Sequence, residues 1–210
     1  MAELRRLGAR SVPVVARGES FVFAQLVGDV VEFLGLDIQT APELAPAELV
    51  RRLDLVLAAA QRQTRQMPPQ ALERELPNRP RSYRVLLHHV FQIPAAFLDA
   101  MDGGTLSYEN MVAPPPEDMR TPAAIAEFGE QVRRRVAAWW AGLGDRSGTQ
   151  PVGTYYGVQP MHEVLERTTW HSAQHVRQVA SLLEQLGIPP EQPLTKSELQ
   201  GLPLPQQLWD

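Results

Sequence analysis

Two histidines four residues apart, His171 and His175, are the side chains of this sequence best suited to chemistry. Residues 161–187 have the apolar spacing of one long helix, and residues four apart on an α-helix leave the same face one turn apart. Both imidazoles could therefore bind one metal ion. The stripe that contains them is apolar at both ends and polar in its middle: Val164, Thr168, His171, His175, Gln178 and Leu182. Because a buried polar group without a partner costs about 1–3 kcal/mol, metal binding is the candidate explanation for the polar middle.

A second predicted helix supplies a third histidine. His88 and His89 are adjacent and point about 100° apart, so that His89 shares its face with apolar residues and His88 with mainly polar ones. His162 lies about 180° around the helix axis from His171 and is expected to be exposed. The remaining set of His89, His171 and His175 offers three neutral nitrogen ligands. Such a set suits zinc, nickel, iron or manganese and leaves a coordination position open. Buried histidines with backbone or water partners are the alternative.

Four long amphipathic segments must position these side chains. Apolar spacing, caps at the starts, and glycine or proline near the ends predict helices over residues 47–67, 83–101, 122–142 and 161–187. Strands are expected only near the N-terminus. The sequence therefore predicts a mainly α fold, an antiparallel four-helix bundle over residues 47–187. Residues 188–210 are rich in proline and are expected to pack on the bundle through Leu202, Leu204 and Trp209.

Residues 1–36 differ in pattern from the rest of the chain. After a short helical segment, residues 11–16 and 21–24 form two β-rich runs around a turn, and a helix then ends at Gly35. Residues 37–46 are expected to be a linker. The runs LGARSVPVV and FVFAQ, followed by a helix that ends in FLG, resemble the C-terminal half of a glutaredoxin. We therefore expect a small α-β-β-α, half-thioredoxin-like appendage.

The glutaredoxin resemblance implies a thiol-binding corner at Val12 and Pro13. These residues match the cis-proline corner of that family, where the backbone of the residue before proline contacts a bound thiol such as glutathione. The half that carries the active-site cysteine is absent, so this segment is not expected to be a working oxidoreductase. A stabilising flap or a remnant is the alternative. The strand at residues 11–16 would lack a neighbour, which leaves an unpaired edge that the rest of the chain or a second subunit must cover, and we expect a homodimer.

Composition excludes several classes of function. The 210 residues carry a net charge of −4 and no strongly basic face, which argues against nucleic-acid binding. No apolar run approaches the roughly 18 residues that a membrane span needs, and no secretory leader is recognised, so we expect a cytoplasmic protein. The chain has no cysteine. Any thiol chemistry must therefore use a thiol from outside the protein.

Two segments carry a second resemblance. LLHHV at residues 86–90 and LERTTWHSAQHVRQ at residues 165–178 resemble the DinB-like metalloprotein family, over roughly residues 45–190. In that family a histidine of the second helix and a His-x-x-x-His pair of the fourth bind a divalent metal ion. This resemblance implies that His89, His171 and His175 are the metal ligands. Gln178 matches a glutamine that commonly follows the last histidine by three residues.

The same resemblance implies a function. Some DinB-like proteins are transferases that use the metal to activate a low-molecular-weight thiol, such as glutathione, bacillithiol or mycothiol, for attack on an electrophile. We expect this activity here, with Arg167, Tyr155 and Tyr156 in contact with the thiol or the electrophile. An ordinary surface or ion-pair role for Arg167 is the alternative.

Two other functions fit the same residues. A divalent ion on three imidazoles can also bring the pKa of bound water near 7, as in metal-dependent hydrolases. Such an enzyme needs a carboxylate base, and the nearest candidate, Glu163, lies about 80° away from the histidine face. The third possibility is a metal-binding or stress-response protein without enzymatic turnover.

Overall fold

The computed structural model describes residues 6–9, 14–77 and 79–209. Contacts within the chain divide it into two units, Met1–Pro42 and Glu43–Asp210. The division falls inside the segment that the sequence predicts as a linker.

The first unit contains a β-hairpin and a helix. Strands β1 (Val14–Arg17) and β2 (Ser20–Phe23) pair antiparallel around a tight turn, in which Gly18 has a φ of 63°. Helix α2 (Val27–Leu34) ends at Gly35, whose φ of 65° suits a residue without a Cβ atom. The predicted hairpin is thus confirmed. Val12 and Pro13 lie outside the described residues, so the thiol-binding corner stays a prediction.

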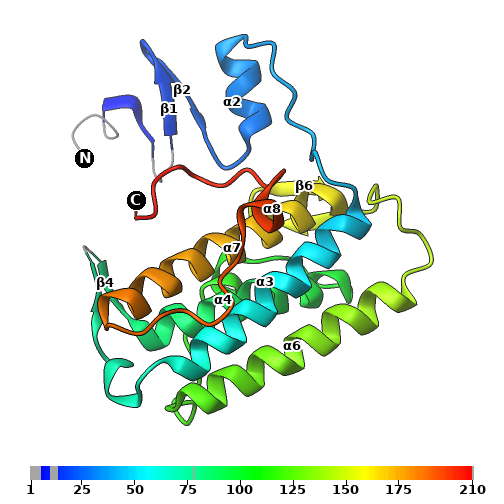
Figure 1. Ribbon diagram of the computed structural model, residues 1–210. Coiled ribbons are helices and arrows are strands. Elements are labelled where there is room, and N and C mark those ends of the chain that lie inside the picture. The colour runs from blue at the N-terminus through cyan, green and yellow to red at the C-terminus, as the bar shows by residue number, and fades with distance from the viewer. Residues whose placement is uncertain (1–5, 10–13, 78, 210) are drawn as a thin grey trace. The chain divides into compact units, whose positions relative to one another are not determined.

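The second unit is mainly helical, as predicted, and its core lies among four long helices. These are α3 (Pro46–Gln66), α4 (Tyr83–Met101), α6 (Pro122–Gly142) and α7 (Met161–Gln185). Both α3 and α4 pack against α6 and α7, so each helix contributes an apolar face to a common interior (Figure 1). The largest fully buried side chains include Phe91, Phe97 and Leu53. Shorter helices are η1 (Pro69–Ala71), α5 (Tyr108–Met111) and α8 (Lys196–Leu199).

The predicted helix starts agree with the structure because local chemistry fixes them. The Ser82 side chain accepts a hydrogen bond from the Val85 N–H at 3.4 Å, and Thr121 accepts one from the Ala124 N–H at 3.1 Å. Each bond satisfies a backbone donor that a helix start leaves unpaired. Pro46 and Pro122 occupy the first turns of α3 and α6, where the missing N–H of proline costs nothing.

The expectation of strands only near the N-terminus is wrong. Two further antiparallel hairpins are present, formed by β3 (Glu75–Leu76) with β4 (Arg79–Ser82) and by β5 (Pro151–Thr154) with β6 (Gly157–Pro160). These strands have only two to four residues, and β4, β5 and β6 contain glycine or proline, so no repeated alternation of apolar and polar residues marks them in the sequence. Backbone pairing between Leu106 and Thr154 helps hold the β5–β6 hairpin.

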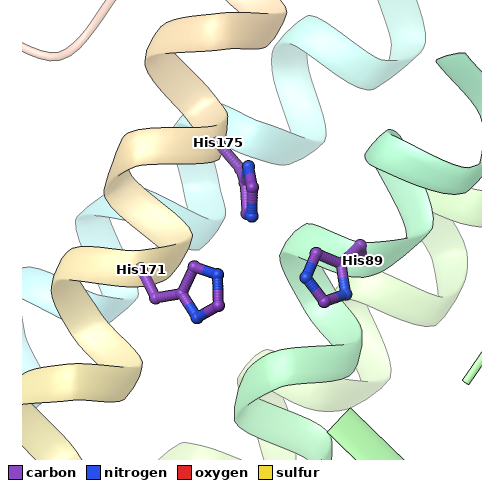
Figure 2. A group of neighbouring side chains, drawn as sticks. All are labelled: His89, His171 and His175. Carbon is purple, nitrogen blue, oxygen red and sulfur yellow. The ribbon is translucent and has the colours of Figure 1, made fainter. Parts of the chain in front are cut away.

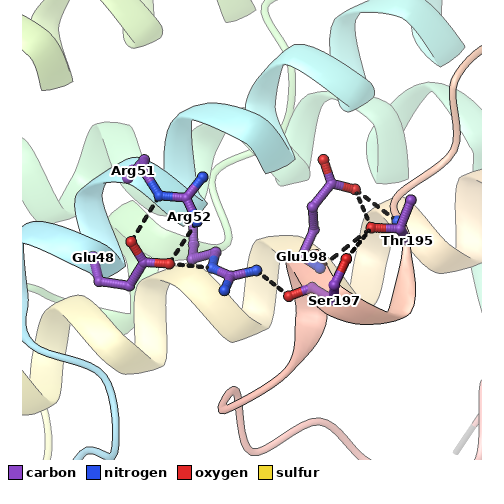
Figure 3. A network of polar contacts seen from close by, with 6 residues as sticks. All are labelled: Glu48, Arg51, Arg52, Thr195, Ser197 and Glu198. Carbon is purple, nitrogen blue, oxygen red and sulfur yellow. Dashed lines mark hydrogen bonds and ion pairs between the residues drawn. The ribbon is translucent and has the colours of Figure 1, made fainter.

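The C-terminal residues pack on the helices as expected. Figure 3 shows Arg52 of α3 joining Glu48 to the Ser197 carbonyl of α8, which begins with a capping box between Thr195 and Glu198. Leu202 is buried, and Leu204 and Trp209 pack against the core.

Within the described residues, no helix combines the length and apolarity needed to cross a membrane.

Candidate metal centre

The three predicted histidines converge between α4 and α7. Figure 2 shows His89 of α4 facing His171 and His175 of α7, and one ring nitrogen from each lies within 4.8 Å of the others. The ring centroids are 5.6 Å apart for His89 and His171, 5.0 Å for His89 and His175, and 4.9 Å for the α7 pair. His89 and His175 are buried and His171 is partly buried. The helix registers read from the sequence therefore place all three imidazoles together.

A hydrogen bond between α4 and α7 fixes how the two helices lie at the cluster. The fully buried Ser172 hydroxyl, next to His171, donates a hydrogen bond to the Val90 carbonyl, next to His89, at 3.0 Å. This bond crosses directly from α7 to α4. It holds the two ligand-bearing turns in register, and sequence reasoning did not single out Ser172. A serine in a small-residue stretch of a helix gives no specific signal for such a contact.

The other polar residues of the α7 stripe have two different explanations. The Thr168 hydroxyl donates to the Val164 carbonyl of its own helix at 2.7 Å, so this buried side chain needs no metal. Gln178 instead supports the cluster, because its Oε1 lies 2.7 Å from Nδ1 of His175. A hydrogen-bonded partner on one nitrogen of a ligating histidine fixes the tautomer and the ring orientation.

Burial keeps the imidazoles of His89 and His171 neutral. Desolvation, reinforced by the neighbouring His175, lowers the pKa of His89 to about 3, although a hydrogen bond to the Met111 backbone opposes this shift. Burial and the same neighbour also lower the pKa of His171 well below its ordinary value. Metal ions bind only the neutral imidazole, so both residues are in the ligand form at neutral pH without prior loss of a proton.

The donor set fits a divalent transition metal. Nitrogens that share a four-coordinate zinc ion lie about 3.4 Å apart, given Zn–N bonds of about 2.0–2.1 Å, and this spacing falls within the 4.8 Å limit of the cluster. Imidazole nitrogens suit zinc, copper, iron and nickel, and three protein ligands leave room for a substrate.

A small apolar pocket adjoins the cluster. Its volume is about 10 Å³, close to the space of a single water molecule. It is lined by three apolar residues and three polar ones: Ile93, Leu106, Met111, Arg167, Thr168 and His171. Sequence reasoning missed Leu106 and Met111 because they lie outside the long helices. Helix α5 brings Met111 to the pocket, held against α4 by a 2.7 Å hydrogen bond from Gln92 to the Asn110 carbonyl.

The structure brings together Arg167, Tyr155 and Tyr156, the three residues expected to contact substrate. The Arg167 guanidinium lies 5.1 Å from the centre of the Tyr156 ring, and its Nη2 is 3.4 Å from the Tyr155 hydroxyl. The tyrosines form the turn of the β5–β6 hairpin, and the Tyr155 N–H donates to the Leu106 carbonyl at 2.9 Å. Burial raises the pKa of Tyr156, so its phenol stays protonated at neutral pH. A cation and two phenols therefore stand beside the pocket.

The remaining two histidines differ from expectation. His88 is only 2% exposed and stacks on Phe128 of α6 at 5.0 Å, so its expected position on a polar outer face is wrong. His162 is partly buried, and its Nε2 lies 2.7 Å from the Leu44 carbonyl. Neither belongs to the cluster. Both were misplaced because residues from other segments cover them, which a single-helix pattern does not contain.

Compared with models of known protein families and with curated proteins, this chain matches none.

Proposed function

We propose that the protein is a divalent-metal-dependent transferase that activates an external low-molecular-weight thiol, of the glutathione type, for attack on an electrophile. The observation that carries the proposal is the convergence of His89, His171 and His175 beside a pocket that Arg167 lines. Three neutral imidazoles add no negative charge to a bound ion, which would therefore strongly lower the pKa of a thiol at its open position. The absence of cysteine fits a thiol supplied from outside.

The residues around the pocket divide the remaining tasks. The apolar side chains of Ile93, Leu106 and Met111 exclude water from the reacting sulfur. A cavity of about 10 Å³ has room for a small group only, so the body of a glutathione-sized molecule would lie outside it. Arg167 and the protonated Tyr156 phenol can then bind a carboxylate of the thiol or the negative charge that develops on the electrophile.

The lining of the pocket favours thiol transfer over hydrolysis. A metal-dependent hydrolase needs a carboxylate that accepts a proton from the attacking water. The residues that line the pocket include no aspartate or glutamate, and Glu163 is exposed.

We further propose that the four long helices form an antiparallel four-helix bundle of the DinB-like type. The support is the mutual packing of α3 and α4 with α6 and α7, together with ligands on the second and fourth of these helices. We keep the thiol-binding corner at Val12 and Pro13, and the homodimer, as parts of the same proposal. Their support is the sequence resemblance of residues 1–36.

The first experiment measures metal binding. The full-length protein, loaded separately with zinc, nickel, iron or manganese, should hold one ion per chain after gel filtration. His171→Ala and His89→Ala should each lose stoichiometric metal, whereas His162→Ala, outside the cluster, should keep it. Stoichiometric metal in both cluster variants would refute the site.

The second experiment measures thiol transfer. The metal-loaded protein is mixed with glutathione, bacillithiol or mycothiol and a chromogenic electrophile, and the loss of electrophile is followed. Acceleration that disappears with a chelator and falls in Arg167→Met, at unchanged metal content, is expected. Ester hydrolysis without thiol would support the hydrolase instead. Full metal occupancy with neither activity would support a non-enzymatic metal-binding protein.

A further inference from the structure

Polar side chains of α7 on both sides of His175 in the sequence contact the end of the described chain. Gln178 Nε2 donates to the Leu208 carbonyl at 2.8 Å, and Gln174 Nε2 donates to the same carbonyl at 2.9 Å. One turn away, Arg177 Nη1 donates to the Pro205 carbonyl at 3.1 Å and to Gln174 Oε1 at 2.7 Å. Three polar side chains of α7, at positions 174, 177 and 178, thus hold residues 205–209, which we call the C-terminal segment.

The chemistry of these contacts determines the orientation of the Gln178 amide. A backbone carbonyl only accepts hydrogen bonds, so the amide group that faces Leu208 must be the NH₂. The other end of the amide, Oε1, therefore faces Nδ1 of His175 at 2.7 Å. Because Oε1 also only accepts, Nδ1 must carry the proton. In a neutral imidazole this leaves the lone pair on Nε2.

We propose that the C-terminal segment is a working part of the metal centre. The Leu208 carbonyl sets the Gln178 amide, the amide sets the tautomer of His175, and that tautomer offers Nε2 as a metal ligand. Gln178 and Leu208 are positioning residues here and do not touch the ion or the substrate. The inference rests on the metal-binding part of the proposed function and is independent of thiol transfer.

The hydrogen bonds from Leu208 through Gln178 to His175 form a relay. Other contacts of residues 188–204 are separate from it. Gln66 of α3 donates to the Pro189 carbonyl at 2.9 Å and accepts from the Glu191 N–H at 2.8 Å. These bonds hold an earlier part of the region and do not involve α7. Gln66→Ala is therefore a control, since it removes glutamine contacts to residues 189–191 while leaving the C-terminal segment in place.

The direct test is the tautomer of His175 in the metal-free, full-length protein. Long-range ¹H–¹⁵N NMR on histidine-labelled protein distinguishes protonated from unprotonated ring nitrogens, and the His175→Ala spectrum assigns the signal. The expected result is a single Nδ1–H tautomer in the wild type and in Gln66→Ala. Gln178→Leu and a chain ending at Leu204 should both show a mixture. An Nε2–H tautomer in the wild type, or an unchanged tautomer in both variants, would overturn the proposal.

A second measurement uses zinc affinity, determined by competition with a chromogenic chelator. Loss of a partner that orients a ligating histidine typically weakens metal binding about 10–100-fold, and we expect this loss for Gln178→Leu and for the chain ending at Leu204. Gln66→Ala should bind zinc like the wild type. Equal affinity in all four proteins would contradict the relay, whether or not the protein transfers thiols.

A variant cycle separates the relay from a general loss of folding. In Gln178→Glu the carboxylate still accepts from Nδ1 of His175 but has no N–H for the Leu208 carbonyl. Removing residues 205–210 should therefore weaken zinc binding in the wild type and leave the affinity of Gln178→Glu unchanged. An equal loss of affinity in both backgrounds would show that the C-terminal segment acts by another route and would overturn the proposal.

Discussion

The adjacent histidines of α4, His88 and His89, are both buried but lie in different surroundings. His89 faces the other two cluster imidazoles, whereas His88 stacks on Phe128, and its buried Nδ1 has no hydrogen-bond partner among the described residues. Burial, with a smaller contribution from the positive charge of Arg84, lowers the pKa of His88 to about 4. His88 is thus a neutral side chain that packs like an apolar residue while carrying an unsatisfied polar atom.

Replacing each of these histidines by leucine should give opposite results. An unsatisfied buried polar atom costs about 1–3 kcal/mol, so His88→Leu should leave the free energy of unfolding unchanged or raise it by about 1 kcal/mol. Metal content should stay at the wild-type level. His89→Leu should lose the metal. Urea unfolding of the metal-free proteins and metal analysis of the loaded proteins measure both effects, and metal loss in His88→Leu would contradict the assignment.

The cluster could be predicted from the sequence because helix geometry fixes the direction of a side chain within its own helix. That geometry put His171 and His175 on one face and His89 on an apolar face. It could not predict the burial of His88, because the covering ring of Phe128 comes from α6. The pocket could not be predicted from the sequence either, since Leu106 lies in a loop and Met111 in a one-turn helix.

At the scale of elements, a glycine allows α6 to approach α4 closely. A Cβ atom on Gly129 would lie 2.5 Å from the ring of Phe91, which is fully buried on α4, two residues after His89. The ring cannot move far, because it lies in the closely packed core. Gly142, at the end of the same helix, has nothing within 4 Å of such a Cβ atom. The two glycines therefore form a natural pair for comparison.

Gly129→Ala should destabilise the protein and Gly142→Ala should not. Overpacking a core with one extra methyl group typically costs about 1–3 kcal/mol, which exceeds the gain of up to about 1 kcal/mol from replacing glycine by alanine in a helix. At Gly142 only that small gain remains. The measurement is the free energy of unfolding in urea for both variants. A Gly129→Ala protein as stable as the wild type would show that α4 and α6 are not in close contact there.

Because of the ion pairs of α3, the free energy of unfolding should fall at acid pH. Hydrogen bonds from Arg51 and then from Arg52 lower the pKa of Glu48 to about 2, against the opposing effect of burial. The folded-state pKa is thus below the ordinary value of 4.5. The contribution of Glu48 to stability is then complete above pH 4.5 and is lost as the pH falls from 4.5 toward 2.

Glu48→Gln reports this contribution directly. The variant should be less stable than the wild type at pH 6, and the difference in unfolding free energy should shrink at pH 3. Because the group is at the surface, the difference should be small, in the range of about 0–1 kcal/mol for exposed ion pairs. Urea unfolding at the two pH values measures it. A difference that is the same at both pH values would mean that the charge of Glu48 is not its cause.

At the scale of the whole molecule, periodic patterns determined what the sequence could predict. The four long helices follow from repeated apolar spacing over many turns and from local caps such as Ser82 and Thr121. The β3–β4 and β5–β6 hairpins have too few residues to repeat any pattern. Yet the β5–β6 turn brings Tyr155 and Tyr156 into contact with Arg167, which lines the pocket, so the least predictable elements complete the surroundings of the predictable cluster.

The division into two units predicts that the second unit folds and binds metal without the first. The three cluster histidines, every residue that lines the pocket and the buried core all lie within Glu43–Asp210. A chain that begins at Glu43 should therefore fold cooperatively and bind zinc with the affinity of the full-length protein. Chelator competition and urea unfolding test both properties. Loss of zinc binding on removal of residues 1–42 would mean that the first unit contributes to the metal centre.

The same truncated chain separates the metal centre from the thiol-binding hypothesis for Val12 and Pro13. If that corner binds the external thiol, removal of residues 1–42 should raise KM for glutathione while zinc affinity stays constant, because binding energy is lost away from the ion. The single change Pro13→Ala in the full-length chain should also raise KM for glutathione. An unchanged KM in both proteins would assign residues 1–42 a role other than thiol binding and leave the three-histidine centre as the place where the thiol is held.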